Sequence, residues 1–243
     1  MGTLAVEETD LGKCVPLVFH QDDGEAHRRR SFMVTTFASA VIHGSPWDSR
    51  FLLYCSDGAR SCSSTYDTLD SWIAWSFVEL SVGKWFQHSP WGEDLKERQV
   101  RAGSEIADGW RGILVFHRGD EKALAKAFHV KNTWVSEEVC FTCKASRMSE
   151  SRNLYTGFGR NAHHRTTIVD FEEFVTSKCN ANAWTRVPGF DPSCIQYDWL
   201  HVLDLSLIPD AAASAVRMQW DMLIDSCNVV RPTLMVCVTI MAS

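Results

Sequence analysis

Several features that would assign this 243-residue chain to a common class are absent from its sequence. There is no glycine-rich loop of the kind that cradles phosphates between a strand and a helix. There is also no Gly-x-Ser-x-Gly turn, which presents the nucleophilic serine of many hydrolases. The sequence therefore gives no support to a P-loop nucleotide-binding protein or to a serine hydrolase of this type.

Long apolar segments are missing as well. The first eight residues carry neither a basic stretch nor a long apolar run, so they do not resemble a secretory signal peptide. The longest late apolar run, Leu234 to Met241, is too short to cross a bilayer, which takes about 20 residues. We expect no membrane partner. We interpret this run as a buried strand, and its place near the C-terminus leads us to expect a truncated domain.

Cysteine is plentiful, but no disulfide framework is indicated. The nine cysteines are odd in number and irregular in spacing. Together with the lack of a signal peptide, this favours a reducing intracellular compartment, either the nucleus or the cytoplasm.

Positive charge is scarce. The net charge of −6 argues against broad non-specific nucleic-acid binding, because such binding relies on Lys and Arg side chains that neutralise phosphates. Local basic patches such as Arg28-Arg29-Arg30 are the exceptions. We therefore expect at most weak binding to DNA.

Hydrophobic residues make up 45% of the chain, with ten Trp and thirteen Phe, which predicts a packed core. Apolar and β-branched runs predict four strands, at residues 15–19, 31–41, 51–55 and 112–116. Apolar spacings of three and four predict helices over residues 65–82 and 121–129.

The order of these elements is three strands, a helix, a strand and a helix. This is the opening order of the ribonuclease-H-like α/β fold, in which a mixed sheet is flanked by helices. We expect the first three strands to form an antiparallel meander. We expect the strands at 15–19 and 112–116 to be adjacent and parallel.

Carboxylates follow two of the predicted strands. Asp22 and Asp23 come after the first strand, and Asp120 comes directly after the fourth. Carboxylates on neighbouring strands are the minimum for holding a divalent ion such as Mg²⁺, so Asp22, Asp23 and Asp120 are the candidate catalytic residues. The alternative is that Gln21-Asp-Asp-Gly24 is a turn with solvated carboxylates.

Cys140 and Cys143 have the spacing of one half of a tetrahedral zinc site. His163 and His164 are the candidates for the third ligand, and Cys179, Cys194 or His201 could supply the fourth. The alternative is two cysteines in a small core. A thiol redox role is not favoured, because the pair does not precede a helix start that would lower a thiol pKa.

The order of the downstream motifs resembles a known family. Cys140-x-x-Cys143 is followed by Asn153-Leu-Tyr155, then by His163-His164-Arg165, and then by Asp198-Trp-Leu-His201. Over residues 110 to 215 this order is similar to the middle part of the transposases of CACTA-like and Plavaka-like eukaryotic DNA transposons.

The resemblance implies DNA strand cleavage and joining by two metal ions held by three carboxylates. The sequence departs from the family pattern at Leu200, where Met is usual. It also ends before the third acid is expected. Asp198 is interpreted as a helix N-cap. His201 would be a metal ligand or a core contact.

Together these observations predict four regions. They are a leader at 1–14, the first part of the ribonuclease-H-like core at 15–135, a Cys/His insertion at 136–195, and a helical segment with the truncated end of the core at 196–243, divided at Pro209. We expect a transposase-like protein that is inactive in this form. The alternative function is a non-catalytic, zinc-stabilised interaction or DNA-binding module.

Overall fold

The computed structural model describes residues 8–26, 30–132, 135–157, 159–198 and 212–218. The chain divides into two compact units, Met1–Tyr197 and Asp198–Ser243. In the second unit, residues 212–218 form a helix. The predicted break at Pro209 and the predicted strand at 234–241 lie outside the described residues.

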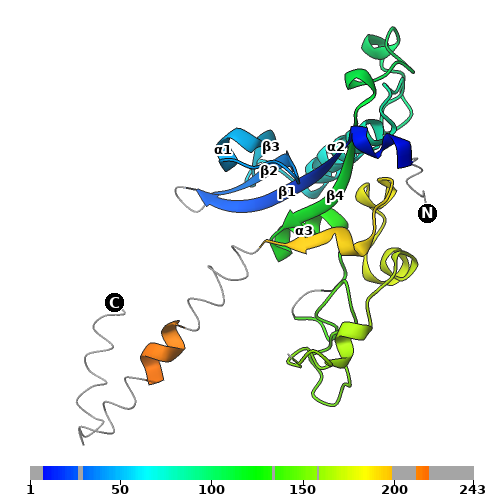
Figure 1. Cartoon of the computed structure of the whole chain (residues 1–243). Coiled ribbons are helices and arrows are strands. Elements are labelled where there is room, and N and C mark those ends of the chain that lie inside the picture. Colours follow the sequence, from blue (N-terminus) through cyan, green and yellow to red (C-terminus); the bar gives the residue numbers. More distant parts are fainter. Residues whose placement is uncertain (1–7, 27–29, 133–134, 158, 199–211, 219–243) are drawn as a thin grey trace, which may run out of the picture. The chain divides into compact units, whose positions relative to one another are not determined.

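The first unit is built on a five-stranded mixed sheet with the order β3-β2-β1-β4-β5 (Figure 1). The strands are β1 (Cys14–Ala26), β2 (Arg30–Ser39), β3 (Arg50–Asp57), β4 (Arg111–Gly119) and β5 (Ile195–Tyr197). The first three form an antiparallel meander, and β4 and β5 continue the sheet parallel to β1. Both expectations for the sheet, the meander and the adjacent parallel strands, are confirmed.

The first strand is longer than predicted. The segment Gln21-Asp-Asp-Gly24, which turn-forming residues predicted to be a turn, continues β1 as far as Ala26. Asp22 pairs with Val34, and Asp23 pairs with Met33. The turn interpretation is therefore wrong. The hydrogen-bonded ladder with β2 outweighs the low strand propensity of Asp and Gly, because strand propensity depends strongly on context.

Two longer helices follow the predicted pattern. They are α2 (Ser63–Val82) and α3 (Glu121–Phe128). Gly83 ends α2 as predicted, since its φ of 74° suits a residue without a Cβ atom and its N–H donates to the Glu79 carbonyl at 2.9 Å. The shorter helical turns are η1 (Glu8–Lys13), α1 (Pro46–Ser49), η3 (Lys96–Arg98), η4 (Ala107–Gly109), η5 (His163–Thr166), α4 (Phe171–Glu173), η6 (Phe174–Lys178), η7 (Trp184–Arg186) and η8 (Pro192–Cys194).

The core lies between the sheet and these helices. Phe19 of β1 packs against Phe77 of α2, with ring centroids 6.0 Å apart, and against Trp184 of η7 at 4.4 Å. All three side chains are almost completely buried. Burial of each such side chain contributes about 1.5–3 kcal/mol, so the segment that carries Trp184 is an integral part of the core.

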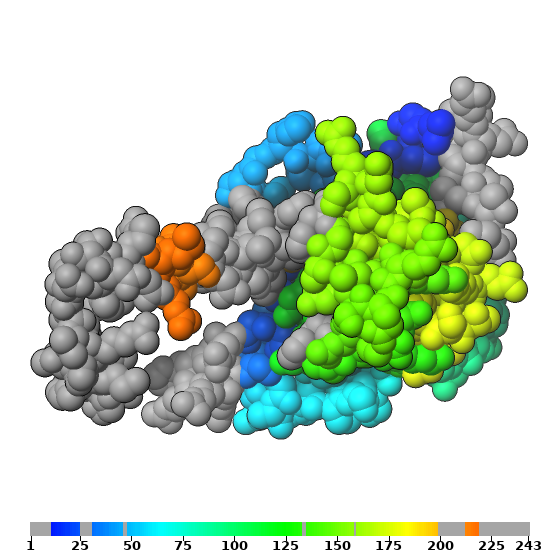
Figure 2. Space-filling model, turned by 90° about the horizontal axis from the view of Figure 1, so that it is seen from below, coloured from blue at the N-terminus to red at the C-terminus, as the bar shows by residue number. Residues whose placement is uncertain are grey.

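The long segment between α3 and β5 contains only short helical turns as regular structure among its described residues. In the space-filling view, its residues 135–170 form a continuous surface beside residues 171–197 (Figure 2). Phe141 anchors this segment, because it is 2% exposed and its ring lies 5.6 Å from that of Tyr197 on β5.

A second irregular segment, residues 84–110, is held against α2 by contacts around a buried ion pair. The buried carboxylate of Glu79 accepts hydrogen bonds from Arg98 Nη1 at 2.6 and 2.7 Å and from the backbone N–H of Phe86 at 2.6 Å. The Arg98 guanidinium lies 4.9 Å from the ring centroids of both Trp75 and Trp85. Charge and cation–π attraction thus hold this segment in place.

His117 of β4 is the most unusual side chain in the core. It is 1% exposed, and neither ring nitrogen has a hydrogen-bond partner among the described residues. Its neighbours are the rings of Phe19, Phe128 and Trp184, with centroids 4.6–4.7 Å away. Burial, with a smaller contribution from His20, lowers the pKa of His117 to about 3, so the ring stays neutral.

We predict that His117→Phe stabilises the protein. At neutral pH the gain should be about 1–3 kcal/mol, because the variant no longer buries unpaired polar nitrogens. The folded pKa is depressed, so the unfolded state binds the extra proton below about pH 6.5, and wild-type stability falls as the pH drops toward 3. The advantage of the variant should therefore grow by about 2 kcal/mol at pH 5. Urea unfolding at both pH values measures this.

The matched control is His43→Gln, which removes an exposed imidazole. This variant should not reproduce the gain in stability expected for His117→Phe at either pH value. A His117→Phe protein that is less stable than wild type at pH 5 would contradict the prediction, because it would mean that the imidazole makes a favourable contact.

Candidate functional site

The three candidate catalytic carboxylates lie at one end of the sheet. Gln21 of β1 pairs with Gly119, the last residue of β4. Asp22 and Asp23 therefore extend just past the end of β4, and Asp120 follows it directly. This end of the sheet is where the parallel pairing brings the predicted acids together.

The side chains of Asp22 and Asp23 lie on opposite faces of the sheet. Successive side chains on a strand point to opposite faces of the sheet. Asp23 lies on the face that packs against α3, where Lys122 and Lys126 contact it. Asp22 is on the other face, with His20. At most one of the two can therefore contribute to a site beside Asp120.

Asp23 already has two cationic partners. Its carboxylate lies 2.7 Å from Lys122 Nζ and 3.0 Å from Lys126 Nζ, and its side chain is only 3% exposed. Burial raises the pKa of Asp23, but the hydrogen bonds and positive charges of the two lysines outweigh this and leave it below its usual value. The carboxylate is therefore ionised, and its charge is neutralised by protein groups.

Asp120 also has a structural role. Its carboxylate accepts a hydrogen bond from the backbone N–H of Ala123 at 2.6 Å and so caps the N-terminus of α3. This role comes directly from its place between β4 and α3. In the part of the chain that the structure describes, no three His, Cys, Asp or Glu side chains converge as they would around a metal ion.

Cys140 and Cys143 belong to a tight loop that is held by backbone pairing. Cys143 is paired with Ile168 in a short antiparallel bridge, and the N–H of Val169 donates to the carbonyl of Thr142 at 3.0 Å. Cys143 is buried and Cys140 is half-buried. The fold thus brings the cysteine loop close to the segment that follows the two histidines.

The two thiols influence each other strongly. Hydrogen bonding from Cys143, and also from the Thr142 hydroxyl at 3.2 Å, lowers the pKa of Cys140. The same interaction with Cys140, together with burial, raises the pKa of Cys143. One proton shared between two sulfurs favours a thiolate at Cys140, which is the form that binds metals or attacks disulfides.

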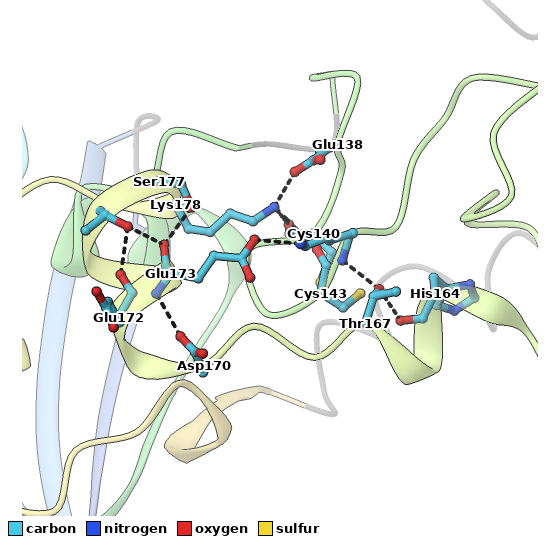
Figure 3. A network of polar contacts seen from close by, with 12 residues as sticks. Glu138, Cys140, Cys143, His164, Thr167, Asp170, Glu172, Glu173, Ser177 and Lys178 are labelled. Atoms are coloured by element: carbon cyan, nitrogen blue, oxygen red, sulfur yellow. Dashed lines mark hydrogen bonds and ion pairs between the residues drawn. The ribbon is translucent and has the colours of Figure 1, made fainter.

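The histidines are placed less favourably. His163 is exposed, and its Nδ1 lies 2.6 Å from Asn153 Oδ1. His164 is half-buried, and its ring points away from the cysteines in Figure 3. Cys179 is buried, and Asn182 Nδ2 lies 3.8 Å from its sulfur, while Cys194 is half-buried. His201 lies outside the described residues. The four-ligand zinc site therefore stays a prediction.

Lys178 is a residue of this region that the sequence did not single out. Its side chain is 3% exposed, forms an ion pair with Glu138, and donates to the carbonyls of Cys140 and Cys143 at 3.4 and 3.5 Å (Figure 3). The buried ammonium group of Lys178 therefore links the carbonyls of both cysteines and stabilises the conformation of the cysteine loop. The sequence contained no signal for it, because Lys178 lies in a polar stretch that reads as exposed.

Asp70 of α2 is the second residue that the sequence did not single out. It is 6% exposed and lies over the sheet, where Gln21 Nε2 donates to its Oδ1 at 3.4 Å. Burial raises the pKa of Asp70 to about 7, although Trp184 and Gln21 act in the opposite direction. The indole N–H of Trp184 has no partner with regular hydrogen-bond geometry, yet it lies close enough to lower this pKa.

A signal for Asp70 was present in the sequence. Asp70, Ala74 and Phe77 recur at spacings of four and three, and all three are buried. Leu69 and Trp72, two apolar residues of the same helix, are only half-buried. A carboxylate on the inward stripe of an amphipathic helix was therefore the feature to notice.

Comparisons with protein-family models, characterised proteins and solved structures gave no match to this chain. Among the described residues, no helix combines the length and the apolar character needed to cross a membrane.

We predict that Asp70→Asn changes how stability depends on pH. The raised folded pKa means that the folded state keeps a proton that the unfolded state loses between about pH 3.8 and 7. As the pH rises through this window, the free energy of unfolding of the wild type should fall by a few kcal/mol relative to that of the variant. One pKa unit corresponds to about 1.4 kcal/mol. Urea unfolding of both proteins at several pH values tests this.

The comparison must be made with the variant at each pH, because His117 produces the opposite slope in the wild-type protein. Glu97→Gln, at an exposed acid of the 84–110 segment, is the control and should not reproduce the change expected for Asp70→Asn. An Asp70→Asn protein whose stability difference from wild type is constant over this pH range would show that Asp70 ionises as it does in the unfolded chain.

We also predict that zinc binds at the cysteine loop. Metal analysis of the purified full chain should find about one zinc per molecule, with zinc–sulfur distances near 2.3 Å by X-ray absorption. Cys140→Ser should lose the metal and stability, whereas Cys55→Ser, at an exposed cysteine, should retain both. A zinc-free wild-type protein, with Cys140→Ser equally stable, would leave two ordinary thiols in a small core.

Proposed function

We propose that this chain is a ribonuclease-H-like domain of transposase ancestry that does not cut DNA in this form and acts as a binding module. The observation that carries the proposal is the sheet, in which β4 and β5 are parallel to β1 in the order β3-β2-β1-β4-β5. This order is that of a ribonuclease-H-like core. The position of Asp120 at the end of β4 agrees with it.

The lack of cleavage is supported by the partners of the acids. Two-metal phosphoryl transfer needs carboxylates that hold two ions about 3.5–4 Å apart. Asp23 is instead neutralised by Lys122 and Lys126, and Asp120 caps α3. Two ammonium groups thus take the role of counterion that a divalent metal would have at Asp23. The residues present do not fit a magnesium site.

The alternative is a zinc-stabilised interaction module with no relation to DNA chemistry. It is favoured by the cysteine loop, where Cys140 and Cys143 share a proton and Phe141 fixes the loop to β5. In that case the sheet would serve only as the scaffold. Loss of zinc would then unfold the loop without affecting the carboxylate end of the sheet.

We predict that the full chain produces no Mg²⁺- or Mn²⁺-dependent nicking of supercoiled plasmid. DNA binding should be weak and should disappear at moderate salt, because the net charge of −6 offers few groups to neutralise phosphates. A gel assay for nicked circles, with a known nuclease as positive control, measures the first effect. Binding at two salt concentrations measures the second.

Asp120→Ala and Asp108→Ala form a matched pair for this assay. Asp108 is an exposed acid in the 84–110 segment, away from the carboxylate end of the sheet. Suppose that wild type and Asp108→Ala both nick the plasmid and Asp120→Ala does not. The carboxylate end of the sheet would then be a working active site. The proposal would then be wrong.

A further inference from the structure

A cavity of about 310 Å³ opens on the helical face of the first unit, and none of the predicted catalytic or zinc-site residues lines it. Its wall is formed by the first half of α2, the end of α3, the segment before η7 and a residue of the 84–110 segment. The side chains that give it chemical character are Asp67, Asp70, Trp91, His129 and Arg186. Its volume is in the range of small-molecule sites.

Asp70 is the buried polar group of this cavity. Its side chain is more than nine-tenths buried. Gln21 Nε2 donates to it at 3.4 Å, and the indole N–H of Trp184 lies close enough to lower its pKa. The Gln21 amide is shared, since the same Nε2 donates to Tyr54 Oη at 3.0 Å. A carboxylate can accept about four hydrogen bonds, so Asp70 keeps acceptor capacity beside these two donors. A buried acceptor in this state favours a ligand that donates to it.

The charged groups around the cavity are balanced. Asp67 on α2 lies 2.8 Å from His129 Nε2 at the end of α3, so these two groups satisfy each other. Arg186 is exposed and lines the cavity. Among the described residues no acidic partner of Arg186 lies within ion-pair distance. The cavity therefore offers an acceptor inside and a cation at its exposed part.

Trp91 adds a flat apolar wall. It is 53% exposed and packs edge-on against Trp72, with ring centroids 5.4 Å apart. An exposed indole face beside a polar cavity suits stacking by a planar ring.

We propose that this cavity binds a guanine nucleotide. The adjacent N1–H and N2–H donors of guanine form the fork that a carboxylate accepts bidentately, so they pair with Asp70. The base stacks on Trp91. The phosphate is attracted to Arg186, which suits anions through its planar guanidinium. A free guanidinium ligand such as arginine offers the same donor fork, but it has no aromatic base to stack on Trp91 and no phosphate for Arg186.

The raised pKa of Asp70 agrees with this site. The carboxyl is close to half ionised at neutral pH because burial disfavours its charge. Two N–H donors from a neutral base stabilise the ionised form without adding charge to the cavity. The site does not depend on the proposed transposase ancestry, because it uses neither the carboxylate end of the sheet nor a metal ion.

The test is calorimetric titration of the full chain with GMP, IMP, AMP and arginine. IMP differs from GMP by the 2-amino group alone, so the loss of one donor to a carboxylate should weaken its binding by about 10-fold or more. AMP presents an acceptor at N1 and should bind at least as weakly as IMP. GMP should saturate the chain below about 1 mM, the limit of useful small-ligand affinity.

Variants assign the contacts. Asp70→Asn keeps the shape of the side chain and should reduce GMP affinity by about 10-fold or more, since the amide N–H₂ opposes the donors of guanine. Arg186→Gln should weaken GMP but leave guanosine unchanged. Asp94→Asn, at an exposed acid outside the cavity, is the control and should bind GMP as wild type does. Circular dichroism of each variant establishes that it is folded.

Equal binding of GMP and IMP would overturn the proposal, because Asp70 would then not read the base. Binding of arginine in place of GMP, or no heat from GMP at about 1 mM with folded wild-type protein, would overturn it as well. A plasmid-nicking result of either kind leaves this conclusion unaffected, so the two proposals fail separately.

Discussion

The parallel pairing of β1 with β4 is the constraint on which the rest of this structure depends. It sets the register in which Gln21 faces Gly119, and so it brings Asp23 and Asp120 to the same end of the sheet. A parallel pair cannot be joined by a tight turn, so the intervening chain must cross over the sheet. Here α2 and residues 84–110 make that crossing, and α2 carries Asp70 over Gln21.

Buried polar groups are concentrated over this crossing. Three of them lie on the face of the sheet that the helices cover: Asp70, His117 and Asp23. The surrounding residues compensate each of these side chains in a different way. Asp23 is compensated by two lysines, His117 stays neutral among aromatic rings, and Asp70 retains unused acceptor capacity. Lysines at Asp23 argue against metal chemistry there, while the cavity beside Asp70 leaves room for a ligand.

Much of the fold could be predicted from local patterns. Alternating and apolar runs predicted four of the five strands, and spacings of three and four predicted both longer helices, because each pattern reports the period of one element. The fifth strand, Ile195–Tyr197, was not predicted, since three residues carry no periodicity. The partners of the candidate residues were equally hidden. Nothing near Asp23 in the sequence indicates that Lys122 and Lys126 would neutralise it.

The sequence by itself determined which segments form strands and helices, that a packed core exists, and that Asp120 would stand between a strand and a helix. Only the tertiary structure decided that Asp22 and Asp23 face opposite sides, that Lys178 is buried beneath the cysteine loop, and that Asp70 lines a cavity. The physical reason is the distance along the chain over which each effect acts. Periodicity and capping depend on neighbours a few residues apart, whereas burial and charge compensation depend on side chains that only the folded sheet brings together.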